Sequence, residues 1–273
     1  MTIGPGQVAV VTGAGSGIGR ALAHGLAARG ARLALADVEE EALAETAASL
    51  RDAGADVLDR SVDVRHATEV DVLATAVRDR FGRVDLVCLN AGVVGPRRPV
   101  WEQHPADWDW VLSVNLGGVA NGLRAFVPGL VAEQRGHVLV TASTAALHPV
   151  RGGGNGPYAA SKHAVLGICE TLREELASAA PDVGVTVLCP GPVATRIRDS
   201  ERNRPVDLRA GGADRGDALP QFAHRVPSVS AEYTAERALA GVSAGAFLVL
   251  PNEGSAEEAR EHAARLHRDA LPG

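Results

Sequence analysis

The stretch VAVVTGAGSGIG, residues 8–19, decides the fold. Its first four residues are apolar, as in a strand buried on both faces, and they run directly into a turn with glycine at alternate positions. A helical pattern follows from Arg20 to Arg29. A strand, a glycine turn and a helix in this order form the first unit of an alternating β/α chain.

The same alternation continues along the chain. Six further apolar runs follow, each separated from the next by a segment long enough for a helix. They are RLALAD from Arg32, VLDRSV from Val57, VDLVCLN from Val84, GHVLVTAS from Gly136, VGVTVLCP from Val183 and AFLVLP from Ala246. Such runs predict a parallel sheet covered on both faces. We therefore expect one α/β domain over residues 1–273, a Rossmann-like, doubly wound parallel sheet of about seven strands.

Local signals divide the rest of the chain. Gly30, Gly54 and Gly82 stand where the first three helices should end in a left-handed cap. The stretch from 190 to about 230 is rich in Arg, Asp, Gly and Pro without a sustained period, and we expect a substrate lid there. Residues from about 255 to 269 predict a polar tail helix on the surface.

Composition narrows the class of protein. Hydrophobic residues make up 46% and charged residues 22%, which is typical of a globular protein. The net charge of −6 gives no basic surface for phosphates, so we expect no nucleic-acid partner. Cys88, Cys169 and Cys189 lie in apolar segments without metal-ligand spacing, which favours buried thiols in a reducing cytosol and no metal site. No signal-peptide pattern or membrane-spanning apolar run is present, so the protein is expected in the cytoplasm, away from membranes.

The glycine turn is suited to a dinucleotide. Without Cβ atoms the backbone can approach a pyrophosphate closely, and the helix that begins there points free N–H groups at the anion. The residues expected at the cofactor are Gly13, Ser16, Gly17, Ile18 and Gly19. A tight strand-to-helix turn without a ligand also uses glycine, so the triplet alone is weak evidence.

Asp37 supports the dinucleotide interpretation and favours NAD over NADP. It ends the second apolar run, where a carboxylate can accept hydrogen bonds from the adenosine ribose and would repel a 2′-phosphate. No Arg or Lys occurs among residues 14–16, and Val38 follows directly. Arg20 keeps NADP open, and Asp37 could instead cap the following helix.

Tyr158 and Lys162 form a candidate acid–base pair. They stand four residues apart at the start of a helical stretch, so both can face one site. An ammonium beside a phenol should lower the phenol's pKa, and Tyr158 could then exchange a proton with a substrate oxygen. A Tyr-x-x-x-Lys pair is also common on ordinary helices.

The order of several motifs resembles the short-chain dehydrogenase/reductase family. They comprise Thr12 to Gly19, Asn90-Ala91-Gly92, Asn115, Ser143, Tyr158-x-x-x-Lys162 and Pro190-Gly191-x-Val193-x-Thr195. The resemblance spans residues 8–196 and implies hydride transfer between a nicotinamide dinucleotide and a carbinol or carbonyl carbon.

The resemblance also implies roles for individual residues. Tyr158 would be the general acid/base, Ser143 would bind the substrate oxygen, Lys162 would hold the nicotinamide ribose, and Asn115 would anchor a relay water. The further cofactor contacts would be Asp63, Val64, Asn90, Ala91, Gly92, Pro190, Gly191, Val193 and Thr195. Structural alternatives stay open: a helix kink at Asn115, a strand-end cap at Ser143 and a helix cap at Thr195.

Two features depart from the family pattern. Ser143 and Tyr158 lie two residues further apart than usual, with a glycine-rich segment at 151–156 that is either a pocket opening or a surface insertion. Asn252-Glu253-Gly254 follows the last apolar run in place of Asp-Gly-Gly, which leaves homodimer and homotetramer both open.

Taken together, these patterns predict an NAD-dependent enzyme that interconverts a small secondary alcohol and its ketone. Residues 93–99, 145–154 and the lid should bound the substrate pocket, and their apolar residues suggest a cyclic, aromatic or steroid-like substrate. An NADP-dependent ketoreductase and a non-catalytic dinucleotide-binding regulatory protein are the alternatives.

Overall fold

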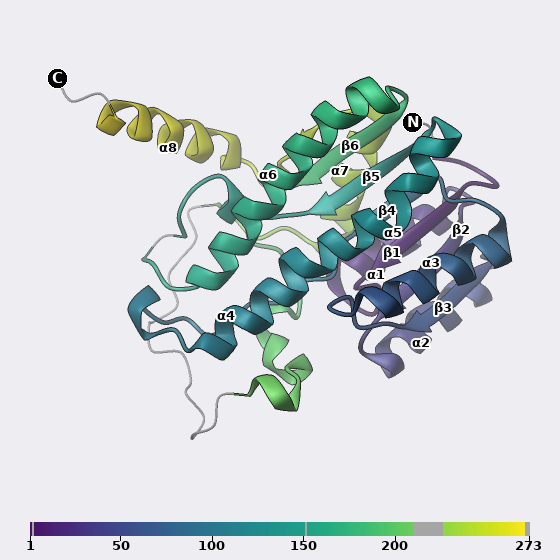
Figure 1. The fold of residues 1–273 in the computed structure, drawn as a ribbon, viewed down its shortest axis with the longest axis horizontal. Helices are drawn as coiled ribbons and strands as arrows, with labels where there is room; N and C mark the ends of the chain where they lie inside the picture. The colour runs from purple at the N-terminus through teal and green to yellow at the C-terminus, as the bar shows by residue number, and fades with distance from the viewer. Residues whose placement is uncertain (2, 151, 210–225, 271–273) are drawn as a thin grey trace.

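The computed structural model describes residues 1, 3–150, 152–209 and 226–270. Its centre is a parallel sheet of seven strands in the order β3-β2-β1-β4-β5-β6-β7 (Figure 1). Every pairing between neighbouring strands is parallel, as the apolar runs predict. The strands are β1 Val8–Thr12, β2 Arg32–Asp37, β3 Val57–Ser61, β4 Leu86–Leu89, β5 Gly136–Thr141, β6 Val183–Leu188 and β7 Leu248–Val249. The predicted doubly wound α/β fold is confirmed.

Helices cover both faces of the sheet (Figure 1). One face packs against α3 (Ala67–Phe81), α5 (Gly118–Glu133) and α6 (Gly156–Ala179), with Leu73, Phe126 and Val165 in the shared core. The other face packs against α1 (Gly17–Ala27), α2 (Glu40–Asp52) and α7 (Ala231–Ala244). Because both faces are covered, the strands lie in two apolar layers, and this explains their near-continuous apolar sequences.

All three glycines predicted to cap helices have a left-handed backbone at a helix end. Gly82 follows the last residue of α3 with a φ of 78°. Gly30 and Gly54, with φ of 81° and 87°, follow α1 and α2. The N–H after each of these two glycines donates back into the helix, from Ala31 to Leu26 at 3.2 Å and from Ala55 to Leu50 at 3.0 Å. This is the bonding of a helix that ends at glycine, so the three predicted caps are confirmed.

The parallel arrangement gathers the carboxyl ends of the strands at one edge of the sheet. The strand order reverses between β1 and β4, which opens a crevice there. Two short 3₁₀ segments, η4 (Ile197–Asn203) and η5 (Val206–Leu208), come from the predicted lid, and residues 210–225 of that lid lie outside the described part. At the crevice α4 (Pro105–Leu112) leads into a π-helical turn, Ser113–Gly117. The tail helix α8, Ser255–Ala270, extends away from the sheet (Figure 1).

Candidate active site

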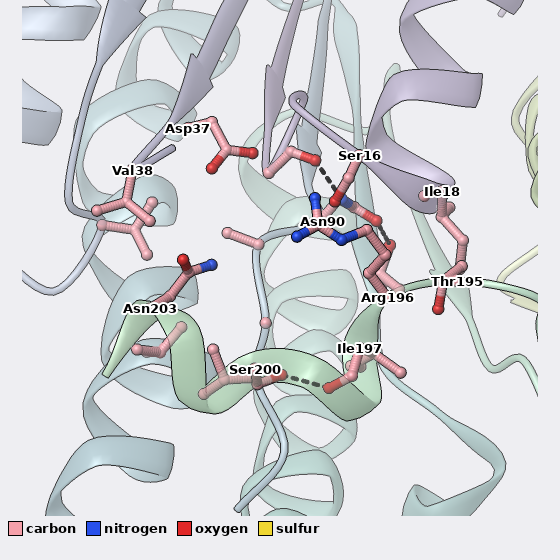
Figure 2. A pocket seen from close by; sticks show the side chains of 18 of the residues that line it. Ser16, Ile18, Asp37, Val38, Asn90, Thr195, Arg196, Ile197, Ser200 and Asn203 are labelled. Atoms are coloured by element: carbon pink, nitrogen blue, oxygen red, sulfur yellow. Dashed lines mark hydrogen bonds between the residues drawn. The ribbon is translucent and has the colours of Figure 1, made fainter. Parts of the chain in front are cut away.

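One pocket at the crevice is lined both by the glycine turn and by Tyr158. Figure 2 shows the part of this pocket around Ser16, Asp37 and Asn203. Sequence patterns predicted most of its described lining. The predicted residues that line it are Gly13, Ser16, Gly17, Ile18, Asp37, Asp63, Val64, Asn90, Ala91, Gly92, Ser143, Tyr158, Lys162, Pro190, Gly191, Val193 and Thr195. Two predicted residues, Gly19 and Asn115, lie behind this lining.

The turn after β1 is shaped by close backbone approaches. A Cβ on Gly13, whose φ is 68°, would lie 2.9 Å from the Cα of Ala91, and one on Gly17 would lie 3.0 Å from Cγ2 of Thr195. Gly19 packs directly beneath the carbonyl of Gly13, so it closes the turn from below and does not face the pocket. Ser16, the residue before α1, makes no side-chain cap, which leaves the first N–H groups of the helix to the pocket. This arrangement fits a pyrophosphate.

Asp37 ends β2 with its carboxylate facing the same pocket. Oδ2 accepts from the N–H of Gly15 at 2.8 Å, and Oδ1 accepts from the N–H of Glu39 at 2.9 Å. Burial raises the pKa of Asp37, and these two backbone donors oppose the rise. The carboxylate therefore steadies the start of α2, as the helix-cap alternative proposed, and also lines the pocket where a ribose would lie.

Arg20 is the residue that left NADP possible as the cofactor, but it does not line this pocket. It lines a separate hollow with His24 and Glu236 on the outer side of α1. Arg65, by contrast, does line the main pocket, but its guanidinium is paired with Asp63 at 2.6 Å.

Tyr158 and Lys162 both face the pocket from the first turns of α6. The Nζ of Lys162 lies 5.6 Å from the centre of the Tyr158 ring and donates to the carbonyl of Thr141 at 2.9 Å. Burial lowers the pKa of Lys162 to about 8. Burial also raises the pKa of Tyr158, and a hydrogen bond with Ser143 only partly offsets that rise. The predicted lowering of the tyrosine's pKa is therefore wrong in net direction, because loss of solvent has the largest effect on this phenol.

Ser143 follows β5 and begins the 3₁₀ turn Thr144–Ala146. Its Oγ accepts from the N–H of Ala145 at 3.1 Å and donates to the carbonyl of Pro190 at 3.4 Å. Ser143 thus caps a short turn, as its structural alternative proposed, and still reaches the phenol of Tyr158. The two extra residues before Tyr158 do not separate the hydroxyl from the phenol.

Asn115 lies fully buried inside the π-helical turn after α4. Its Oδ1 accepts from the N–H of Val93 at 2.8 Å, and its Nδ2 donates to the carbonyl of Val93 and the hydroxyl of Ser161, each at 3.0 Å. A π-helical turn marks many functional sites. Here it lets the amide fix the chain beside Gly92, one layer behind the pocket surface.

The predicted boundaries of the pocket are only partly those of the structure. Val93 and lid residues between 190 and 203 line it, whereas the described residues of 145–154 do not. Ala145 and Ala146 are buried at 4% and 3% exposure, so the start of this segment packs inward, whereas Pro149, Gly152 and Gly153 are exposed. Arg151 lies outside the described residues.

Sequence reasoning missed several residues of the site. Asn252 is buried, accepts from the N–H of Gly191 at 2.8 Å, and donates to the carbonyls of Pro192 and Pro227 at 2.9 and 3.0 Å. Asn252 stands where the common family ending has aspartate, but nothing in the sequence indicates its hydrogen-bond partners. Lid residues without a motif were also missed, namely Arg196, Ile197, Ser200, Arg202 and Asn203.

A model of the short chain dehydrogenase family matches residues 7–205. The chain belongs to the short-chain dehydrogenase/reductase family. It is 37% identical over 248 residues to 1-deoxy-11-beta-hydroxypentalenate dehydrogenase of Streptomyces avermitilis, covering 90% of this chain and 84% of the relative. It is 36% identical over 201 residues to a CLA biosynthesis dehydrogenase/reductase of Lactiplantibacillus plantarum, covering 73% and 69%.

Solved structures agree with this family. A short-chain dehydrogenase/reductase from Burkholderia phymatum in complex with NAD superimposes with a TM-score of 0.91 at 37% identity, covering 100% of this chain and 98% of that one. An alcohol dehydrogenase from Thermococcus sibiricus complexed with 5-hydroxy-NADP gives 0.73 at 28% identity, covering 89% and 95%. This short-chain dehydrogenase/reductase is therefore an oxidoreductase that acts on CH–OH donors of small molecules with a nicotinamide dinucleotide.

Three further findings concern metal sites, membrane spans and cysteines. Among the described residues, no group of three or more His, Cys, Asp or Glu is placed to hold a metal ion. No described helix has the length and apolar character to cross a bilayer. Cys88, Cys169 and Cys189 are free and buried, in agreement with the prediction of buried thiols.

Proposed function

We propose that this enzyme is an NAD-dependent secondary alcohol dehydrogenase or ketone reductase. The observation that supports this most is the meeting of Tyr158, Ser143 and Lys162 in the pocket that also holds the glycine turn and Asp37. A nicotinamide dinucleotide held at the glycine turn and Asp37 would supply the hydride acceptor for the alcohol or the hydride donor for the ketone. The protein's own residues then handle the oxygen and its proton.

Tyr158 gives a proton to the ketone oxygen, or takes one from the alcohol, by general acid–base catalysis. Its raised pKa keeps the phenol protonated at neutral pH, which suits ketone reduction. Ser143, hydrogen-bonded to this phenol, holds the substrate oxygen in line. Lys162 holds the nicotinamide ribose, and Asn115 keeps the backbone beside it in place through Val93.

NAD is favoured by the environment of Asp37. Its half-buried carboxylate lines the pocket at the end of β2, where it could accept hydrogen bonds from the hydroxyls of an adenosine ribose, and Val38 beside it offers no positive charge. A 2′-phosphate would meet that carboxylate without a compensating cation from the turn. The Thermococcus sibiricus structure is complexed with 5-hydroxy-NADP and the Burkholderia phymatum structure with NAD, so this fold binds both kinds of dinucleotide.

The substrate is proposed to be an apolar alicyclic, aromatic or steroid-like alcohol. Val93, Trp110 and Val114 line the pocket, and Trp110 is fully buried. The Streptomyces relative is named for a hydroxypentalenate, which agrees with a bulky carbon skeleton.

We also propose a homodimer through α5 and α6, one of the two assemblies that the sequence leaves open. An apolar hollow between these helices supports it, with Leu123, Val127, Pro128, Ile168 and Leu172 in its wall. Such a surface is a candidate for burial against a second copy.

The test of the proposed function is to mix purified enzyme with NAD and a panel of cyclic secondary alcohols and follow NADH absorbance. We expect turnover that is lost in Tyr158→Phe. No absorbance change with any member, with the two proteins indistinguishable, would reject this function. Faster turnover with NADP than with NAD would instead indicate the NADP-dependent ketoreductase.

A further inference from the structure

Glu39 joins the lid to the loop that carries Asp37. Its carboxylate accepts from Arg202 of η4, whose Nε lies 3.1 Å from Oε1 and 3.0 Å from Oε2 and whose Nη2 lies 2.5 Å from Oε1. Asn203 adds a bond from Nδ2 at 2.9 Å, and Nη1 of Arg196 lies 3.9 Å from Oε2. One carboxylate therefore contacts three lid side chains, of which Arg202 lies 163 residues further along the chain.

Glu39 also contacts Asp37, the carboxylate proposed to bind the adenosine ribose. Glu39 precedes α2, and its N–H donates to Oδ1 of Asp37 at 2.9 Å. Its backbone thus holds Asp37 while its side chain holds the lid. The pair with Arg202 is partly screened from solvent, with side chains 21% and 25% exposed, so it is held more firmly than an exposed ion pair.

Glu39 engages two of the cations that line the pocket. Two other cations line the described part of the pocket, and each has a partner of its own. Arg65 is paired with Asp63, and Lys162 donates to the carbonyl of Thr141. The lid guanidiniums, Arg196 and Arg202, both face Glu39. Figure 2 shows Arg196 and Asn203 pointing from the lid toward the edge where Ser16 and Asp37 lie.

We propose that Glu39 is a second residue that determines cofactor selectivity, because its carboxylate occupies the two lid arginines that would otherwise bind a 2′-phosphate. The proposal rests on NAD being the preferred cofactor. A guanidinium binds phosphate through two parallel charge-assisted hydrogen bonds. With Glu39 in place, a 2′-phosphate must compete with a carboxylate that is hydrogen-bonded to Arg202 and lies 3.9 Å from Arg196, and it is also repelled by the carboxylates of Asp37 and Glu39.

Neutralising Glu39 should reverse this effect. In Glu39→Gln the amide can still accept a hydrogen bond, but the charge that holds Arg196 and Arg202 is gone. The Nη1 of Arg202 stays bonded to the carbonyls of Arg196 and Asp199, which keeps the guanidinium in place, while its Nε and Nη2 and the Arg196 guanidinium become available to a phosphate. The gain for NADP should be about tenfold, the size expected for one strong charge-assisted contact, while NAD binding should change far less because NAD carries no 2′-phosphate.

The experiment measures Kd for NADPH and NADH by quenching of protein fluorescence, using the full-length wild type, Glu39→Gln and Glu39→Ala. The readout is the ratio of the two Kd values, which needs no substrate. We expect both variants to lower the NADPH/NADH ratio by about tenfold. An unchanged ratio in the variants, or an equal shift of both Kd values, overturns the proposal and leaves Glu39 as a lid contact only.

Further variants separate the arginines from the charge of Glu39 itself. Adding Arg196→Gln and Arg202→Gln to Glu39→Gln should restore the wild-type ratio, and persistence of the gain would contradict the role of the arginines. Asp71→Asn, which breaks the exposed pair between Asp71 and Arg124 at 2.7 Å, is the matched control and should leave the ratio unchanged. The ratio of the two Kd values in the wild type tests the proposed preference for NAD. The change in that ratio on substitution tests the role of Glu39.

Discussion

The side-chain amide of Asn252 holds the turn at Gly191, whose N–H donates to Oδ1 at 2.8 Å across 61 residues of sequence. The other end of the amide donates to Pro192 and Pro227. One buried side chain thus ties the segment after β7 to the start of the lid, which lines the cofactor pocket. Asn252, which replaces the aspartate of the common family ending, therefore fixes the backbone at the start of the lid.

Asn252→Ala should therefore weaken both the fold and cofactor binding. The substitution leaves one buried N–H and two carbonyls without their partner, at a cost of about 2–4 kcal/mol in the free energy of unfolding. Urea denaturation measures this cost, and KM for NAD should rise because the Gly191 turn loosens. Gln134→Ala removes an exposed amide that also meets two carbonyls, and it should change both values little. Equal effects of the two substitutions would contradict the role of Asn252.

The rate of each reaction direction should depend on pH with opposite sign. Because burial raises the pKa of Tyr158, the phenol stays protonated through neutral pH and loses its proton only in alkaline solution. Ketone reduction needs the protonated phenol and should fall as pH rises, whereas alcohol oxidation needs the phenolate and should increase. Profiles of kcat/KM in both directions check this. A reduction rate that rises through the alkaline range would be incompatible with Tyr158 as the proton donor.

His137 should make the fold sensitive to mild acid. It is 2% exposed, its Nε2 lies 2.8 Å from Oγ1 of Thr186, and burial, followed by the charge of the N-terminus, lowers its pKa to about 4. The unfolded chain takes up a proton near pH 6.5 and the folded chain only near 4. Stability is therefore full above 6.5 and is lost as pH falls toward 4.

The loss at His137 should reach a few kcal/mol, measured as the free energy of unfolding in urea between pH 7 and 4. His137→Gln should reduce that slope, whereas His163→Gln, at an exposed histidine of α6, should preserve it. Identical slopes in wild type and His137→Gln would assign the acid sensitivity to other groups.

A charge in the hollow between α5 and α6 should dissociate the proposed dimer. Ile168→Asp places a carboxylate in the apolar wall, where burial against a second copy would cost several kcal/mol. Light scattering should show a dimer for wild type and a monomer for the variant. Val72→Glu, at a position on α3 that is 55% exposed, is the control and should remain a dimer. A dimeric Ile168→Asp would place the interface elsewhere.

The parts of this enzyme that depend on neighbouring residues, namely its strands and the turns after them, could be predicted from the sequence. Apolar runs predict buried parallel strands, and parallel strands bring their following residues to one edge, so Gly13 and Asp37 could be assigned to one site. Ser143 was added to that site by the family resemblance. Gly19 and Asn115 were placed in the right region, but which layer they occupy depends on packing against Gly13 and Val93.

What could not be predicted depends on contacts between distant segments. Glu39 and Arg202 are ordinary charged residues in sequence, and only the fold of the lid brings them together. The pKa of Tyr158 was predicted in the wrong direction because the spacing to Lys162 shows a charge but not the extent of burial.

The most direct measurement is a single-turnover experiment in which NADH formation is followed after excess enzyme and NAD meet a cyclic alcohol that wild type oxidises. Tyr158→Phe should bind NAD with nearly unchanged Kd and form NADH about 10²–10⁴ times more slowly. The proton-transfer role of Tyr158 is contradicted if the variant forms NADH at the wild-type rate while binding NAD equally well.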